Sequence, residues 1–449
     1  GYDFGPAGVR AAAEAGATLV LTGDCGTVAH EPIAAAQSLG IDVLVTDHHT
    51  PGATLPPALA VVNPNRADCT YPYEALCGTG VAFKVCQALV RARGADDEPL
   101  RWYLDLVAMA TIADLVPLTG ENRVLVHYGL RLLPQTRNPG LRALLRSTGL
   151  DARPTIAAGQ VSHVLAPRIN AVGRMGAAAR GVDLLLADDT AAADALATLS
   201  ETENDTRRAV DRATLDEALT LLARDYDPET DYAVVLAAEG WHPGVIGIVA
   251  SRVVEHIHRP AVLIALNGSS GRGSARSIPP FDLYAGIHSC APLLERYGGH
   301  RQAAGLEVRA DRIADLRAAL NAHARSVLTP QQLVPELACD LELRLDEATS
   351  ELHAMLRHVG PHGIGNPTPV FVARAVDAGG RMRVVGDGHA RLRLRQGDAT
   401  LDAIGFRLAD RVGALDLYAP LDIAFHLQED HWNGRARLQL RLLDVRPAA

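Results

Sequence analysis

Short apolar runs alternate with helical stretches over the first part of the chain. Ala17–Leu21, Ile41–Val45 and Ala58–Val62 are apolar runs of strand length, which predicts buried strands. Val9–Ala15 ends a predicted helix, and a second predicted helix starts near Glu31-Pro32 and stops at Gly40. Since right-handed crossovers keep successive strands parallel, this alternation predicts an α/β fold with a parallel sheet.

Helical patterns dominate the middle of the chain. Gly78–Arg91 and Leu100–Ile112 have helical periodicity and are rich in Ala and Leu. A much longer Ala-rich helix is predicted from about Thr190 to Arg224, and at 1.5 Å per residue it would be about 50 Å long. We expect this helix to connect two domains and to wall a cleft between them.

The remaining patterns predict a second α/β domain and then a β-barrel. Tyr232–Leu236 and Ala261–Leu266 are predicted strands, with a helix after the Glu239–Gly247 segment. From about Pro335 the chain changes to short alternating strands, near residue 370 and at 381–385, 389–395, 401–406, 421–427 and 436–443. Several short strands in roughly 110 residues predict a small β-barrel.

Composition limits the class of protein. A chain of 449 residues favours two to four domains, and no apolar run approaches the ~20 residues of a membrane span. We therefore expect a soluble protein. The six cysteines form no Cys-x-x-Cys pair, which indicates reduced thiols in a cytoplasmic protein and argues against a zinc site built on cysteine. With a net charge of −9, any contact with nucleic acid must follow a local basic track.

Arginine supplies nearly all the positive charge, since Lys84 is the sole lysine among 43 basic residues. Either nucleotide bias in the genome or selection for phosphate binding would explain this excess of arginine over lysine. In either case a phosphate site in this chain must use guanidinium groups.

Acidic and imidazole side chains follow the predicted strands. Asp47, His48 and His49 come directly after one strand and Asp24 after the preceding one, so they meet at the carboxyl edge of the sheet. Asp114 ends a predicted helix among apolar residues, where a carboxylate needs a cation or hydrogen-bond donors beside it. Solvated side chains are the alternative. A thiolate-free cluster of this kind favours Mn²⁺ or Mg²⁺ and suits two-metal hydrolysis of a phosphodiester or polyphosphate.

Three later segments are candidate anion sites. Gly271–Ser277 is interpreted as a glycine-rich loop with two arginines and two serines, and Tyr297–Gly305 as a second small-residue loop. Plain flexible connections are the alternative. A predicted hairpin carries Arg381, Arg383, Arg391, Arg393 and Arg395, which fits either a nucleic-acid groove or a charged, protected edge strand.

Taken in order, these motifs resemble the DHH phosphoesterase superfamily and, within it, the bacterial RecJ family of single-strand-specific 5′→3′ exonucleases. The resemblance covers nearly the whole chain. It rests on Asp24–Gly26, Thr46–His49 with Pro51-Gly52, Ala113–Leu118, Pro167–Met175, Gly240–Gly244, Gly271–Ser274 and Gly299–Gly305. Gly360–Pro367 resembles the start of the family's OB-fold, with His362 where an aromatic residue is common.

The resemblance implies domain boundaries and residue roles. It implies a DHH domain at 1–186, a connector helix at 187–226, a DHH-associated substrate-binding domain at 227–330 and a nucleic-acid-binding OB-fold at 331–449. Two metal ions are expected. Asp24 would bridge the two ions, and His48 and Asp114 would complete the coordination shell of one of them. His49 would contact the scissile phosphate, and Asp47 would orient the imidazoles. The substrate-binding residues would be Arg272, Ser274 and Arg276 at the 5′ phosphate, and Arg168, Asn170, Arg174 and His300 along the path between domains.

One feature departs from the family pattern. The family's earlier Asp-x-Asp motif has no counterpart, so the chain is expected to be an N-terminally shortened form with impaired activity. The expected function is metal-dependent 5′→3′ hydrolysis of single-stranded DNA in recombination and repair. A non-catalytic nucleic-acid-binding scaffold and a short-oligonucleotide phosphodiesterase are the alternatives. The resemblance further implies a monomer that works with a helicase and a single-strand-binding protein.

Overall fold

A computed structural model describes residues 4–175, 178–432 and 435–448 of the chain. The chain folds into two compact units. The first unit comprises residues 1–137, 148–166 and 338–449, and the second comprises 138–147 and 167–337. No helix in the described part of the chain is long and apolar enough to cross a membrane.

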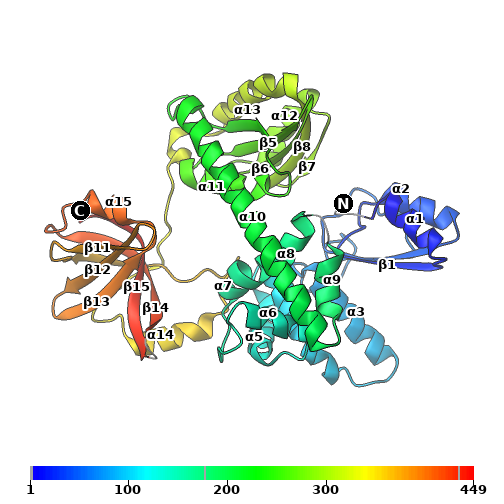
Figure 1. Ribbon diagram of the computed structural model, residues 1–449, viewed down its shortest axis with the longest axis horizontal. Coiled ribbons are helices and arrows are strands. Elements are labelled where there is room, and N and C mark those ends of the chain that lie inside the picture. The colour runs from blue at the N-terminus through cyan, green and yellow to red at the C-terminus, as the bar shows by residue number, and fades with distance from the viewer. Residues whose placement is uncertain (1–3, 176–177, 433–434, 449) are drawn as a thin grey trace. The chain divides into compact units, whose positions relative to one another are not determined.

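A parallel sheet opens the first unit and confirms the prediction. Its strands β1 (Leu19–Gly23), β2 (Asp42–Thr46) and β3 (Ala60–Val62) lie in that order, and both pairings are parallel. The helices α1 (Pro6–Glu14) and α2 (His30–Ser38) cover one face of the sheet (Figure 1). The parallel pairing brings the carboxyl ends of β1 and β2 to one edge.

Helices follow the sheet in the same unit: α3 (Gly78–Ala92), α4 (Leu104–Ala113), α5 (Gly120–Leu132) and the short α7 (Ala158–Gln160). The helix predicted at Leu100–Ile112 is present, and its first residues form a 3₁₀ helix at Glu98–Tyr103 that leads into α4. At its far end Leu115 adopts φ +60°, a left-handed conformation that stops α4 after Asp114.

The β-rich end of the chain forms the predicted barrel, also in the first unit. The strand order is β11-β12-β13-β15-β14-β10-β9, and a bridge between Asp377 and Arg395 links the region after β10 back to β12. Its elements are β9 (Leu341–Glu342), α14 (Ser350–Leu356), β10 (Phe371–Val376), β11 (Met382–Val385), β12 (His389–Gln396), β13 (Ala399–Gly405), α15 (Ala409–Gly413), β14 (Leu421–Trp432) and β15 (Arg435–Pro447). Alternate residues of these strands fill the interior, including Phe371, Leu392 and Phe425.

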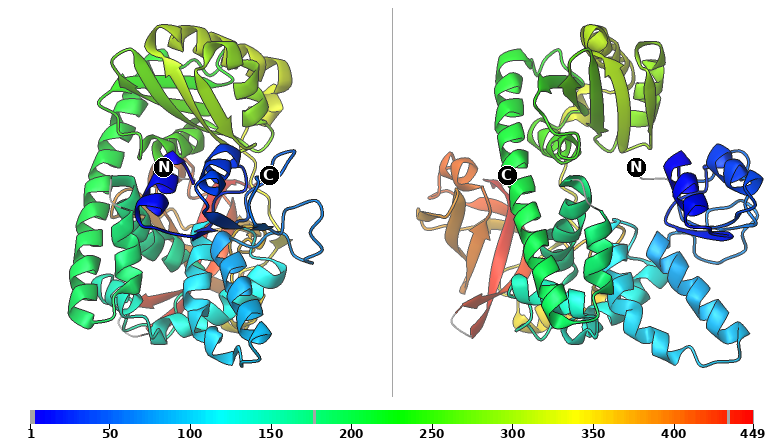
Figure 2. Two further views of the ribbon diagram at one scale, coloured as in Figure 1. Left: turned by 90° about the vertical axis from the view of Figure 1, so that its right-hand side faces the viewer. Right: turned by 45° about the vertical axis from the view of Figure 1, so that its right-hand side comes forward.

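The second unit contains the long helix α10 (Thr190–Asp225), which confirms the prediction at 36 residues. Figure 2 shows it unbroken in both views. The other helices are α6 (Pro139–Ser147), α8 (Ala166–Met175), α9 (Ala179–Leu186), α11 (Ile246–Ile257), α12 (Leu283–Ser289) and α13 (Ile313–Val327).

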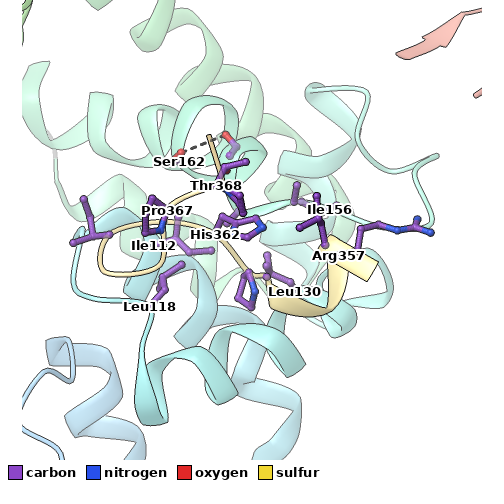
Figure 3. Close-up of a pocket in the computed structure, with 18 of the residues that line it drawn as sticks. Ile112, Leu118, Leu130, Ile156, Ser162, Arg357, His362, Pro367 and Thr368 are labelled. Carbon is purple, nitrogen blue, oxygen red and sulfur yellow. Dashed lines mark hydrogen bonds between the residues drawn. The ribbon is translucent and has the colours of Figure 1, made fainter. Parts of the chain in front are cut away.

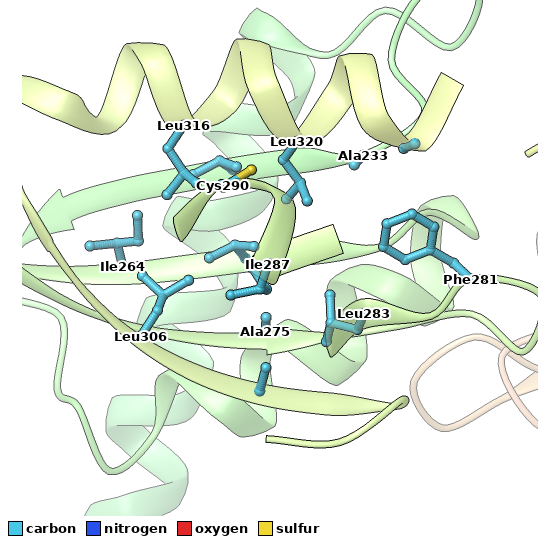
Figure 4. Close-up of a cluster of buried hydrophobic side chains, with 14 of the residues drawn as sticks. Ala233, Ile264, Ala275, Phe281, Leu283, Ile287, Cys290, Leu306, Leu316 and Leu320 are labelled. Carbon is cyan, nitrogen blue, oxygen red and sulfur yellow. The ribbon is translucent and has the colours of Figure 1, made fainter. Parts of the chain in front are cut away.

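A five-stranded mixed sheet forms the core of this unit, in the order β4-β5-β6-β8-β7. The strands are β4 (Val234–Glu239), β5 (Ala261–Asn267), β6 (Ser270–Arg276), β7 (Arg296–Gly299) and β8 (Ala303–Arg309). Helices α12 and α13 pack on one face, where Figure 4 shows Ile264, Ala275 and Leu306 grouped with Leu316 and Leu320. Helix α11 and the end of α10 pack on the other face. The result is a three-layer α/β/α domain.

The loop predicted at Gly271–Ser277 is wrong, because residues 270–276 form the central strand β6. Its glycines lie where the sheet is crowded. A Cβ on Gly271 would lie 2.6 Å from Ile264, and one on Gly273 would lie 2.6 Å from Leu306. Glycine is therefore required here by close packing. The predicted Tyr297–Gly305 loop is likewise a hairpin of β7 and β8 with only a short turn.

Candidate metal and substrate sites

The predicted acid and imidazole groups gather at the carboxyl edge of the parallel sheet. The backbone N–H of Asp24 donates to the carbonyl of Thr46 at 2.9 Å, and that of Asp47 donates to Val62 at 3.0 Å. The strand pairing therefore continues as far as these residues. Asp24 itself adopts φ +65°, a conformation that Asp and Asn tolerate better than most residues.

Two carboxylates converge on one ring nitrogen of His48. Its Nε2 lies 3.0 Å from Asp24 Oδ1 and 3.4 Å from Asp114 Oδ2. This nitrogen is buried and makes no hydrogen bond of acceptable geometry within the described part of the chain. A buried, unsatisfied nitrogen between two carboxylates is costly without a cation to coordinate. The geometry therefore fits a divalent metal ion.

His49 belongs to the same group. Ligand atoms of Asp24, His48 and His49 all lie within 4.8 Å of one another, and Asp114 adjoins this group at Nε2 of His48. The two imidazole rings are 4.6 Å apart between centroids. Both His49 and Asp114 can therefore contribute to a site centred on Asp24 and His48.

Asp47 is a buried acceptor that organises this edge. Its Oδ1 accepts the backbone N–H of His48 at 2.7 Å and of His49 at 3.2 Å, and the Nδ1 of His49 lies 2.7 Å away. Its Oδ2 accepts the N–H of Thr27 at 3.0 Å. The carboxylate is thus occupied on both oxygens. It fixes the ring of His49 and leaves Nε2 of that ring for a ligand.

The electrostatics follow from burial and these contacts. Burial opposes ionisation of Asp47, but the hydrogen bonds from His49 and Thr27 outweigh it, so the pKa of Asp47 is far below its usual range. The hydrogen bond to Asp47 raises the pKa of His49. Burial would lower the pKa of His48, but Asp24 and Asp114 reverse this and raise it. Burial raises the pKa of Asp114 despite the opposing effect of His48. A bound cation would relieve the opposition between burial and neighbouring charge at His48 and Asp114.

Several residues that position the site were not predicted. A Cβ on Gly78, the first residue of α3, would lie 2.4 Å from Asp24 Oδ1, so only glycine allows this approach. The side-chain amide of Asn63 donates to the carbonyl of His49 at 2.8 Å, and the amide of Asn65 donates to the carbonyl of His48. Asn63 directly follows β3, a strand-end signal that the sequence contained. Gly78 gave no such signal.

The predicted phosphate-binding residues share one face of β6. Arg272, Ser274 and Arg276 alternate with buried residues, and a guanidinium NH1 of Arg276 lies 3.3 Å from Ser274 Oγ. A Cβ on Gly247, in the first turn of α11, would lie 2.9 Å from Ser274 Oγ and 3.1 Å from a guanidinium nitrogen of Arg276. The arginine and serine therefore lie beside the positive end of a helix, which favours anions.

The other predicted substrate residues are dispersed in the second unit. Arg168 on α8 is buried and pairs with Glu201 of α10, whereas Asn170 is exposed. His300 is exposed in the turn between β7 and β8. The side chain of Arg174 lies outside the part of the chain that the structure describes.

Arginine side chains gather on the outer side of β11 and β12, a surface called here the basic face of the barrel. Arg391 and Arg393 project from β12, with Arg383 of β11 opposite Arg391, and they line a depression of about 630 Å³. The guanidinium of Arg441 lies 5.4 Å from the ring centre of Phe406, which is 48% exposed. Because β12 pairs on both sides, the protected-edge interpretation is wrong for β12 and holds only for β11.

Family models match three segments of the chain. They are the DHH family N-terminal domain at residues 4–111, the DHHA1 domain at 230–326 and the RecJ OB domain at 339–444.

Individual relatives extend the match over the whole chain. It is 36% identical to the single-stranded-DNA-specific exonuclease RecJ of Bacillus subtilis over 99% of its length, and spans 56% of that protein. It is 36% identical to RecJ of Dickeya dadantii over its whole length, and spans 80% of that protein. The crystal structure of Mn²⁺-bound RecJ from Thermus thermophilus matches with a TM-score of 0.85 and 34% identity, over 98% of this chain and 63% of that one. A Mg²⁺-bound structure of the same protein matches with a TM-score of 0.79.

Proposed function

Because the chain belongs to the RecJ family of single-stranded-DNA-specific exonucleases, we propose that it performs metal-dependent 5′→3′ hydrolysis of single-stranded DNA in recombination and repair. The observation that carries this proposal is the buried Nε2 of His48, unsatisfied between Asp24 and Asp114. A phosphodiester is the substrate that such a site, together with an arginine-rich anion site, would serve.

In this proposal Asp24, His48 and Asp114 hold Mn²⁺ or Mg²⁺. Carboxylate oxygens suit either ion, and the imidazole favours Mn²⁺. A bound ion would supply an activated water and steady the charge on the leaving oxygen. His49, fixed through Nδ1 by Asp47, presents Nε2 to the scissile phosphate and carries a proton more readily than a free histidine. Asp47 acts as the residue that holds this ring in place.

We further propose that Arg272, Ser274 and Arg276 bind the 5′-terminal phosphate. Arginine forms paired hydrogen bonds with phosphate oxygens, and the start of α11 adds backbone N–H groups. Asn170 and His300, which are exposed, and Arg174 remain candidates for contacts along the strand. Arg168 would have to leave Glu201 to contact DNA.

The basic face of the barrel is the proposed track for the rest of the strand. Arginines along β11 and β12 would follow the phosphates, and exposed Phe406 offers a surface for base stacking. This local track is compatible with a net charge of −9, because one depression is lined by five arginines: Arg381, Arg383, Arg391, Arg393 and Arg395.

The domain boundaries at 186, 226 and 330 and the cellular setting are also proposals. We propose a cytoplasmic monomer that acts beside a helicase and a single-strand-binding protein, on the basis of the family resemblance. Light scattering of the purified chain tests the oligomeric state, and a mass twice the 47.6 kDa of the chain would contradict it.

The activity is tested by release of nucleotides from linear 5′-phosphorylated single strands in Mn²⁺, with the chain joined to the Asp-x-Asp segment that the family resemblance implies. We expect release that stops when the metal is chelated, and loss of release in His48→Ala and Asp114→Asn. His256→Ala is a matched control, since His256 is an exposed histidine on α11. Equal cutting of circular single strands, or activity in His48→Ala, would overturn the proposal.

A further inference from the structure

We propose that the loop Gly360–Pro367, which leads into the barrel, is a positioning element for the metal ligand Asp114. This inference rests on the metal site proposed above. Its basis is a set of close contacts between this loop and the connection between α4 and α5, whose first residue is Asp114. Both segments belong to the first unit.

The α4–α5 connection is short and has an unusual backbone. Asp114 caps α4, Leu115 turns the chain at φ +60°, and Thr119 precedes α5. Leu115 is 63% exposed, so its own packing does little to hold that conformation. Helix α4 holds the backbone of Asp114, whose N–H donates to the carbonyl of Ala110 at 2.9 Å, and the contacts of residues 116–119 fix the direction in which the chain leaves Asp114.

The Gly360–Pro367 loop supplies that support through a tight turn. Gly363 and Asn366 exchange backbone hydrogen bonds of 2.9 and 3.1 Å, with Ile364 and Gly365 at the tip and Gly365 at φ +73°. At this tip the carbonyl of Ile364 accepts the backbone N–H of Leu118 at 2.7 Å. The hydrogen bond links the loop directly to the connection that starts at Asp114.

Two glycines allow the loop to approach this closely. A Cβ on Gly363 would lie 2.7 Å from Leu118 Cδ1, and Leu118 is buried. A Cβ on Gly365 would lie 3.1 Å from Pro117 and 3.2 Å from Thr119. Residues 363–365 of the loop thus pack against residues 117–119 of the α4–α5 connection.

The base of the loop is fixed as well. The side-chain amide of Asn366 donates to the carbonyls of Val359 at 2.9 Å and Pro361 at 2.8 Å. From α5, Arg123 donates to the carbonyls of Gly360 at 3.3 Å and His358 at 3.2 Å. The loop therefore contacts the metal-bearing domain at its tip and at its base.

A cavity lies beside these contacts. It has a volume of about 730 Å³, and its walls include Ile112 and Leu118 on one side and His362 and Pro367 on the other. Figure 3 shows Leu118, His362 and Pro367 among the residues that line this space. The tip of the loop adds to two other contacts of residues 117–119: the hydroxyl of Tyr73 donates to the carbonyl of Thr119 at 2.8 Å, and the side-chain amide of Asn122 donates to the carbonyl of Pro117 at 3.0 Å.

Mn²⁺ affinity tests the inference without relying on catalysis. We measure the Mn²⁺ dissociation constant from the electron paramagnetic resonance signal of free Mn²⁺, and the melting temperature of the metal-free protein. Gly365→Ala should weaken Mn²⁺ binding about 10-fold, the usual scale for loss of a group that supports a ligand. Gly94→Ala is the matched control, because Gly94 has φ +69° and a Cβ there would have nothing within 4 Å in the described part of the chain.

Both glycine variants place alanine in a left-handed conformation, so the metal-free melting temperature should fall in both. Gly365→Ala should then differ from Gly94→Ala in its affinity for Mn²⁺. A second variant, Arg123→Ala, should also weaken Mn²⁺ binding, and Arg123→Lys should restore part of it. Equal Mn²⁺ affinity in Gly365→Ala, Arg123→Ala and the wild type would overturn the inference while leaving the proposed function intact. Failure of the wild type itself to bind Mn²⁺ would overturn both.

Discussion

Replacing Gly78 by alanine tests how closely α3 must approach the proposed metal site. The new Cβ would lie 2.4 Å from Asp24 Oδ1 and 2.5 Å from its Cγ, about 1 Å short of the 3.4 Å where ordinary contact begins. Asp24 cannot easily yield, because its backbone is already left-handed and tied to Thr46. A ligand displaced by about 1 Å costs on the order of 100-fold in rate, or about 2.7 kcal/mol of transition-state stabilisation.

The assay compares nucleotide release and Mn²⁺ affinity in Gly78→Ala, Gly80→Ala and the wild type. Gly80 lies in the same helix, but a Cβ there would meet Leu76 at an ordinary 3.4 Å. We expect Gly80→Ala to resemble the wild type and Gly78→Ala to lose about 100-fold in kcat/KM. Wild-type activity in Gly78→Ala, or an equal loss in both variants, would refute the reasoning.

Three further predictions concern other parts of the proposed sites. Asp47→Asn should lower the free energy of unfolding by about 3 kcal/mol at pH 7, since a buried charged acceptor of several hydrogen bonds is lost. Folding lowers the pKa of Asp47, so the carboxylate contributes its full stabilisation above the pKa that it has in the unfolded chain. In urea titrations the difference in free energy of unfolding between the wild type and Asp47→Asn should therefore shrink as the pH falls below about 4. Arg391→Ala combined with Arg393→Ala should weaken single-strand binding and reduce the salt slope by about 0.7 per lost phosphate contact, measured by fluorescence anisotropy; an unchanged slope would argue against the basic face. Arg276→Lys should reduce the preference for 5′-phosphorylated over 5′-hydroxyl strands about 10-fold in kcat/KM, and an unchanged preference would exclude Arg276 from the 5′ phosphate site.

The strand-end residues were predictable because two local signals agree. An apolar run defines each strand, and parallel pairing then determines which ends meet, so Asp24 and His48 could be brought together from the sequence. The long helix at 190–225 and the barrel strands followed from periodicity in the same way.

The β6 strand was not predictable by these rules. Gly271 and Gly273 suggest a flexible loop when read locally, but they are glycine because Ile264 and Leu306 occupy the space above them. The role of Gly78 was hidden for the same reason, since its neighbour Asp24 is distant along the chain. Such close approaches are properties of the packed structure and leave no periodic pattern.

The left-handed backbone of Asp24 has a practical consequence for trapping a complex with DNA. Asparagine accepts φ near +65° about as well as aspartate, so Asp24→Asn would remove one negative charge from the metal site and leave the turn unchanged. Alanine at this position would add backbone strain to the loss of the carboxylate. Asp24→Asn is therefore the substitution best suited to capturing an uncleaved strand for crystallisation.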